Sequence, residues 1–240
     1  PPDRVEAGVA AFTHVGLDYF GPFFVKHRRN REKRYGCLFT CLKTRAVHVE
    51  VAHTLDADSF MSALYRFFAR RGMPAVIRSD NGKNLIAGER ELRGILRSWN
   101  QQRITEGLAE RSVKWIFNPP DASHMGGVWE RQIRTIRRML AGLVQEQVLT
   151  DEALRTLMTI AEGIVNNRPL TAASDDPKDL EVLTPNHLLI LKTASLPGRD
   201  FGPETRYVRQ RWKQVLLLAN TFWTRWIQSY LPSLRARTKW

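Results

Sequence analysis

The chain has 240 residues, and its hydrophobic content of 43% is enough to build the core of one large domain. Its 37 Lys and Arg residues outnumber 24 Asp and Glu residues, so the formal net charge is +13; this favours a polyanionic partner, with a basic protein lacking one as the alternative. No apolar run approaches the roughly 20 residues that cross a bilayer, so we expect no membrane partner.

The first half of the chain is expected to form strands. Residues 11–20, 35–43 and 45–51 are rich in aromatic and β-branched side chains, which favour strands. The first two are joined by the hydrophilic segment 26–34, which carries six Lys or Arg residues and one Glu. We expect this segment to be a basic tip between strands, and it is either a DNA or partner surface or an ordinary solvated face.

A helix is expected after the third strand. Asp56 or Asp58 can cap its start, and the Arg-Arg-Gly sequence at 70–72 is a typical helix end. A short strand of the buried type follows at 75–79 and ends immediately before Asp80.

The second half is expected to be mainly helical. A helix fits 89–99, where apolar residues recur at steps of three and four, and 113–117 reads as a fifth strand. The segment 118–127 has two prolines and two glycines, so it is expected to be a loop. Helices are expected over 128–147 and 151–167.

This order of elements predicts an α/β fold: a three-stranded meander continued by two crossover strands. It is the element order of the ribonuclease-H-like fold, a mixed five-stranded sheet flanked by helices, and a helical C-terminal extension follows it here. We therefore predict a linker over 1–10, a core domain over 11–172, an irregular connector over 173–204, and an amphipathic helical extension over 205–240 that begins a truncated C-terminal region.

The two cysteines are expected to be free thiols. Cys37 and Cys41 lie four residues apart in an expected strand, which separates them by about 13 Å at roughly 3.3 Å per residue. A disulfide needs Cα atoms within about 7 Å. Buried thiols in a reducing compartment are therefore expected.

Three acidic residues fall where this fold would gather them. Asp18 lies in the first strand, Asp80 follows the fourth, and Glu130 begins helix 128–147. Since the first and fourth strands are neighbours in such a sheet, we expect Asp18 beside Asp80. Converging carboxylates repel unless a cation lies among them, and their hard oxygen ligands suit Mg²⁺ or Mn²⁺. The alternatives are a plain turn at Asp80 and an ordinary ion pair between Glu130 and Arg134.

These segments resemble a known family. The stretches "VGLDYFGPF", "RYGCLFTCLKTRAVHVEV", "SDNGKN" and "NPPDASHMGGVWERQIR" are similar to the integrase core of retroelements, most closely that of BEL/Pao retrotransposons. "NNRPLT", "LTPNHLL" and "FWTRWIQSYLPSLRARTKW" resemble the stretch that follows this core in the same polyproteins. The family's usual Thr-Asn-Phe after the turn is replaced here by "KNL", which places Lys83 near the acids.

The resemblance implies a metal-dependent polynucleotidyl transferase. Asp18, Asp80 and Glu130 would be its catalytic acids and the ligands of two Mg²⁺ or Mn²⁺ ions. The reactions would be 3′-end processing and strand transfer into target DNA. The implied partners are double-stranded DNA, as element ends and target, and further copies of the chain. The implied location is the nucleus, with a cytoplasmic particle phase.

Further residues are expected to contact DNA. They are basic or polar and lie beside the acids in the sequence: Lys83, Asn84, His124, Arg131, Arg134, Arg137 and Arg138. Two alternative functions are also compatible with the same three acids. One is another nuclease on the same fold, such as a ribonuclease H or a resolvase-like enzyme. The other is a catalytically silent, host-adopted relic that acts as a DNA-binding or scaffold protein.

Overall fold

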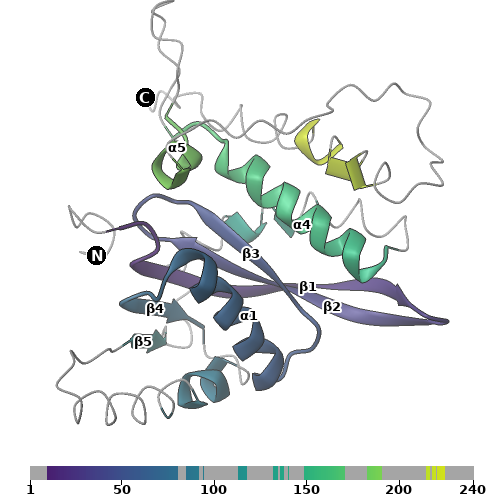
Figure 1. The fold of residues 1–240 in the computed structure, drawn as a ribbon, viewed down its shortest axis with the longest axis horizontal. Coiled ribbons are helices and arrows are strands. Elements are labelled where there is room, and N and C mark those ends of the chain that lie inside the picture. The colour runs from purple at the N-terminus through teal and green to yellow at the C-terminus, as the bar shows by residue number, and fades with distance from the viewer. Residues whose placement is uncertain are drawn as a thin grey trace, which may run out of the picture. The chain divides into compact units, whose positions relative to one another are not determined.

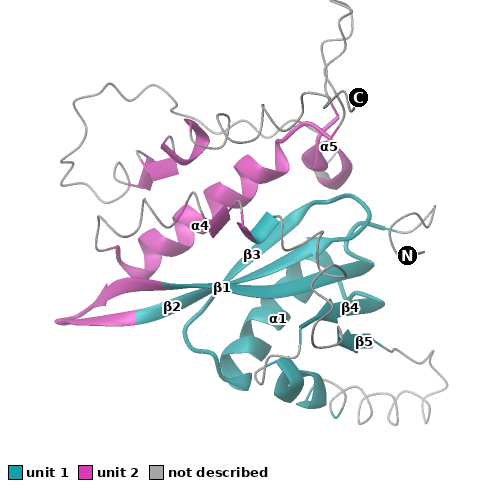
Figure 2. Ribbon diagram, turned by 180° about the vertical axis from the view of Figure 1, so that it is seen from behind, with its two compact units in different colours: residues 1–22, 33–133 teal, residues 23–32, 134–240 magenta. Residues whose placement is uncertain are grey.

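The computed structural model describes residues 10–80, 85–91, 94, 113–117, 132–134, 136–137, 140, 149–170, 183–190, 215–216, 218–219 and 221–224 (Figure 1). The chain divides into two compact units, residues 1–22 with 33–133 and residues 23–32 with 134–240 (Figure 2). The division into linker, core, connector and extension stays a prediction.

The first unit is built on a mixed five-stranded sheet of order β3-β2-β1-β4-β5. Its strands are β1 (His14–His27), β2 (Asn30–Cys41), β3 (Val47–Ala52), β4 (Val76–Ser79) and β5 (Lys114–Phe117). A two-residue turn joins β1 to β2, so this pair is antiparallel, as is β2 with β3, whereas β4 pairs in parallel with both β1 and β5. This is the ribonuclease-H-like sheet that the order of elements predicted.

Helix α1 (Ala57–Arg71) connects β3 to β4 and packs on β3 (Figure 1). Of its two expected caps, Asp56 is the N-cap, because its carboxylate accepts the Ser59 N–H at 2.8 Å. The Thr54 hydroxyl and that N–H both donate to Asp56 and lower its pKa. Gly72 ends the helix with φ 82°. The expected apolar face is buried, at Phe60, Leu64 and Phe67.

The helix predicted over 89–99 begins earlier, because residues 85–91 and 94 are helical. Leu85 is buried, which explains the earlier start: it adds an apolar anchor about one turn before the predicted start at residue 89. Gly88 lies so close to α1 that an added Cβ would come within 2.2 Å of the Phe60 ring. These two helices can therefore approach so closely only because residue 88 is a glycine, which has no side chain.

The basic segment 26–34 joins β1 to β2 at the tip of a hairpin, as expected, but most of it is strand, so the strands predicted over 11–20 and 35–43 were too short. β1 continues to His27 and β2 begins at Asn30, which leaves only a turn at 28–29. Phe23 and Val25 are buried while the residues between and after them are exposed, and this alternation extends the strand despite the charged composition.

The second unit contains α4 (Asp151–Asn166), close to the predicted bounds and capped by the Thr150 hydroxyl. A short helix, α5 (Pro185–Ile190), lies within the predicted connector, so that segment is not wholly irregular. Its sequence signal was present: the Thr184 hydroxyl accepts the His187 N–H and a proline opens the first turn. The side chain of Asn186 donates to Asn167 at the end of α4 at 2.7 Å.

Two further predicted helices are described in part. Within 128–147, residues 132–134, 136–137 and 140 are helical, and the apolar stripe is buried at Ile133, Ile136 and Leu140. Within the extension, helical residues at 215–216, 218–219 and 221–224 bury Val215, Ala219 and Phe222, as their spacing predicted. The loop 118–127 lies outside the described residues.

The expectation of free thiols is confirmed, since Cys37 and Cys41 are buried and unbridged. Burial is the main reason why the pKa of the Cys37 thiol lies well above its ordinary value, and the nearby Glu50 charge adds to the effect. In the part of the chain that the structure describes, no helix has the length and apolar character needed to span a bilayer.

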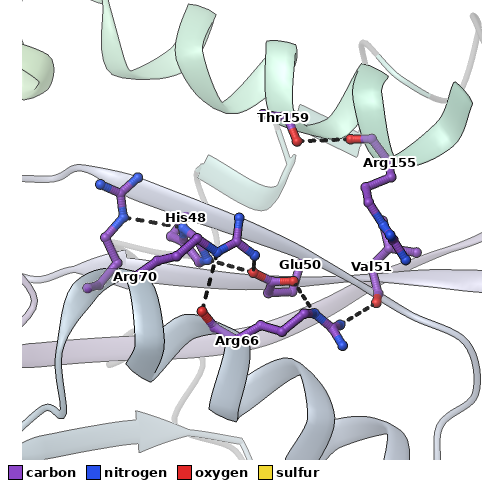
Figure 3. Close-up of polar contacts among 8 residues, drawn as sticks. His48, Glu50, Val51, Arg66, Arg70, Arg155 and Thr159 are labelled. Carbon is purple, nitrogen blue, oxygen red and sulfur yellow. Dashed lines mark hydrogen bonds and ion pairs between the residues drawn. The ribbon is translucent and has the colours of Figure 1, made fainter. Parts of the chain in front are cut away.

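A buried carboxylate joins α1 to the edge strand β3 (Figure 3). Glu50 accepts the Arg66 Nε–H at 2.7 Å and bonds the His48 Nε2 at 2.8 Å, and the Arg70 guanidinium is its third partner. Arg71 Nε lies 3.3 Å from His48 Nδ1, so Nδ1 is the acceptor and Nε2 carries the proton that bonds Glu50. Burial raises the pKa of Glu50, but the hydrogen bonds from His48 and Arg66 outweigh it, and the pKa is lowered.

Replacing Glu50 tests this connection. Glu50→Gln leaves two guanidiniums facing a neutral amide, and both are partly solvated, so we expect the free energy of unfolding to fall by about 2 kcal/mol. Urea denaturation at pH 7 measures it. Glu91→Gln, at an exposed helical residue, is the matched control and should change the value by less than about 0.5 kcal/mol. Equal effects of the two variants would contradict the account.

The same carboxylate predicts a pH dependence. Because the folded pKa of Glu50 lies below the ordinary value of a glutamate, its contribution is present above that ordinary value and lost as the pH falls through the folded pKa. The stability difference between wild type and Glu50→Gln should therefore be full at about pH 6 and shrink at about pH 3. Urea midpoints of both proteins at a series of pH values measure this difference. A stability difference that grew on acidification would contradict the prediction.

Candidate metal and catalytic site

The parallel pairing of β1 with β4 places two carboxylates at one edge of the sheet. The register runs from His14 opposite Val76 to Leu17 opposite Ser79. Asp18 and Asp80 each follow immediately, so they occupy the next opposite positions, Asp18 within β1 and Asp80 directly after the carboxyl end of β4. Paired strands are about 4.8 Å apart, which brings the two side chains within reach of one small ion.

Buried side chains fix this register. Leu17 and Ile77 are fully buried on β1 and β4, so a slip of one residue would turn them to the opposite face. β4 ends at Ser79, whose hydroxyl accepts the Trp115 indole N–H at 3.0 Å and donates to the Asp80 carbonyl at 2.9 Å. This two-bond chain from β5 holds the backbone at Asp80.

The two carboxylates differ in exposure. Asp18 is half-buried and Asp80 is exposed to solvent. One Asp18 oxygen accepts the Tyr19 backbone N–H at 2.7 Å, which orients the carboxylate. Carboxylate oxygens at the edge of a sheet are suitable ligands for Mg²⁺ or Mn²⁺. The pair has the donor chemistry that part of a metal site requires, and its role as such a site stays a prediction.

Within the described ranges, no group of three or more His, Cys, Asp or Glu side chains could hold a metal. Glu130, the expected third acid, lies outside these ranges, as do most of the expected DNA contacts: Lys83, Asn84, His124, Arg131 and Arg138. Arg134 and Arg137 are described. Both are helical and exposed, one turn apart beside the buried Ile133 and Ile136. The roles of all these residues stay predictions.

Sequence reasoning missed the residues that support Asp80. Ser79 is fully buried, and Trp115 lies on β5, far from it in the sequence. The one available signal was the tryptophan itself, because a buried indole N–H requires an acceptor. Which acceptor it finds depends on the strand order, and the sequence pattern alone does not give that pairing.

Comparisons with known proteins give a family match and several structural neighbours. Residues 210–240 match a family of unknown function (DUF5641), which covers less than half of the chain. No curated protein matched the chain.

The chain is similar to a chain of the simian T-cell lymphotropic virus intasome, with 16% identity and a TM-score of 0.48 over 76% of this chain. It spans 61% of the length of that intasome chain. It is also similar to the HTLV-2 integrase catalytic core domain in complex with magnesium, in trimeric form, with 15% identity and a TM-score of 0.44 over 72% of this chain and 94% of that one. The catalytic core domain of BIV integrase is 14% identical, with a TM-score of 0.46 over 70% of this chain and 93% of that one.

The carboxylate pair predicts a metal response. Mg²⁺ or Mn²⁺ at about ten times its dissociation constant should raise the thermal unfolding midpoint of wild type by about 3 °C. Asp18→Asn and Asp80→Asn should lose this response and keep a metal-free midpoint equal to or above that of wild type, because they relieve carboxylate repulsion. Differential scanning fluorimetry with and without EDTA measures it, with Glu91→Gln as the control. A full metal response in both Asp variants would exclude this site.

Proposed function

We propose that the chain is the catalytic core of a retroelement integrase of the BEL/Pao type, acting on double-stranded DNA. The observation that carries this proposal is the β1–β4 register, which brings Asp18 and Asp80 to one edge of a ribonuclease-H-like sheet. The third acid is Glu130, which follows them in the sequence. The net charge of +13 is suited to a polyanionic substrate.

The donor set fits hard divalent cations. Asp18 and Asp80, completed by Glu130, would hold two Mg²⁺ or Mn²⁺ ions. When bound, such ions supply Lewis-acid stabilisation of the phosphoryl group and activate the attacking hydroxyl. The Tyr19 N–H orients the Asp18 carboxylate, and the bonds from Trp115 to Ser79 and from Ser79 to the Asp80 carbonyl hold the second ligand in place.

The proposed reactions are two successive phosphoryl transfers. In 3′-end processing, water attacks a phosphodiester near the element's end and a 3′-hydroxyl is released. In strand transfer, that hydroxyl attacks a phosphorus in target DNA, and the 3′ oxygen of the target strand leaves. Neither step requires a covalent bond to the protein. The side chains therefore have to bind the metal ions and the DNA, orient the reacting groups and neutralise phosphate charge.

The basic side chains beside the acids take the binding role in this proposal. Arg134 and Arg137, both exposed on one helix face, contact DNA phosphates together with Arg131 and Arg138. Such contacts carry little sequence information and weaken strongly with salt. Lys83, Asn84 and His124 flank the scissile phosphate. The working form is a homo-oligomer that acts on chromosomal DNA in the nucleus.

The direct test is metal-dependent joining on a branched, disintegration-type DNA substrate, which asks least of segments outside the core. Wild type should join the strands in Mg²⁺ or Mn²⁺. Asp80→Asn should be slower by about 10³-fold or more, because loss of a metal ligand removes several kcal/mol of transition-state stabilisation. DNA binding and the unfolding midpoint of this variant should remain close to those of wild type, and Glu91→Gln should join normally.

Two outcomes would change the assignment. Joining that persists in Asp80→Asn would exclude the acid triad as the catalytic site. A folded wild type that binds DNA but joins nothing would favour the silent relic, provided that a longer chain carrying the flanking segments is also inactive.

A further inference from the structure

We propose that the tip of the β1–β2 hairpin is a second DNA-contacting surface, which grips the phosphate backbone of duplex DNA. The tip is defined by Lys26, Arg28, Arg29 and Arg31. It deepens the proposed function and rests on it only for the choice of DNA as the polyanion, because the charge and geometry of the tip are independent of the acids.

The hairpin geometry concentrates positive charge. β1 ends at His27 and β2 begins at Asn30, so the turn at 28–29 sets these residues opposite each other and Lys26 opposite Arg31. Side chains at opposite positions project from the same face of a hairpin, about 5 Å apart at Cβ. Like charges in this position destabilise the pairing, so an anionic ligand on this face would relieve a repulsion that is built into the fold.

The four cations are exposed. No ion pair connects Lys26, Arg28, Arg29 or Arg31 to another residue that the structure describes. The acidic side chain nearest along the strands, Glu32, is half-buried and alternates to the face opposite Arg31. Asp151 lies 3.7 Å from the ring of His27. The charge of the four-residue tip is therefore available to a ligand.

The opposite face of the hairpin is anchored. Phe23 and Val25 are buried, Val25 forms a parallel bridge with Leu149, and the Lys26 N–H donates to the Leu149 carbonyl at 2.7 Å. The basic face is thus presented from a fixed strand. A two-stranded ribbon of this kind is narrow enough for a DNA groove about 12 Å wide, and guanidiniums bind phosphates in bidentate fashion.

The turn itself gives an independent indication. Arg28 has φ 55°, in the left-handed region that glycine or asparagine adopts most easily. Arginine disfavours this backbone conformation. Strain of this kind, which Phe12 and Arg45 share, is a starting point for a functional hypothesis, and a cation at the outermost point of the hairpin is the one best placed to meet a phosphate.

A binding assay without metal tests the surface apart from catalysis. Lys26→Gln, Arg29→Gln and Arg31→Gln are combined in one variant. The matched control combines Arg90→Gln, Lys114→Gln and Arg155→Gln, which removes three exposed cations elsewhere. Fluorescence anisotropy with a labelled mixed-sequence duplex in EDTA, at several salt concentrations, gives the affinity and its salt dependence.

The hairpin variant should bind at least about 10-fold more weakly than wild type at 0.1 M salt. Its slope of log affinity against log salt should be shallower by about 2 to 3, because each phosphate contact contributes about 0.9. The control variant should stay within about 3-fold. Equal losses in the two variants, or a wild type that fails to bind duplex DNA, would overturn the proposal.

Arg28→Gly provides a variant that cannot be dismissed as misfolded. Glycine relieves the positive φ, so the thermal midpoint should equal or exceed that of wild type, whereas the affinity for the duplex should fall by about 3-fold or more. Unchanged affinity would show that Arg28 does not belong to the proposed DNA-contacting surface. If DNA binding depends on the hairpin but no metal-dependent joining is found, the integrase proposal fails and the hairpin surface stands. If joining is found but DNA binding does not depend on the hairpin, the hairpin surface fails and the integrase proposal stands.

Discussion

The parallel pairing of β1 with β4 is the constraint on which the candidate site depends. The paired register runs to Leu17 opposite Ser79, and an aspartate follows each of them: Asp18 within β1 and Asp80 directly after β4. A slip of one residue would bury a carboxylate and expose an aliphatic side chain. The same burial that stabilises the sheet therefore also brings two like charges together, an arrangement that is unfavourable until a cation or another counter-charge joins them.

The rest of the first unit supports this pairing from both sides. On one side, α1 leads from β3 into β4, and the buried Glu50 carboxylate ties that helix to β3 through Arg66 and Arg70. On the other side, the Trp115 indole of β5 bonds Ser79 at the end of β4. Both supports are directional polar contacts to a buried partner, Glu50 in one and Ser79 in the other, and such bonds favour one arrangement.

The sequence predicted the elements that repeat a simple pattern. Strand order, the adjacency of Asp18 and Asp80, and the N-cap of α1 followed from periodicity, element order and capping chemistry. The strands of the β1–β2 hairpin were predicted too short, because the composition of 26–34 is typical of a loop, whereas the burial of alternate side chains extends β1 to His27. α5 was missed because Pro and Gly around it suggested a connector. The Glu50 network joins residues 16 and 20 positions apart, and no local pattern reveals such pairs.

The central claim is that Asp18 and Asp80 share a divalent cation at the carboxyl edge of the sheet. The most direct measurement is anomalous diffraction from crystals grown with Mn²⁺, for wild type and for Asp80→Asn. We predict a manganese peak in wild type within about 2–2.5 Å of oxygens of both carboxylates, and its loss in the variant. A folded wild type whose ordered aspartates show no peak in saturating Mn²⁺, or a peak that persists in Asp80→Asn, would contradict the account.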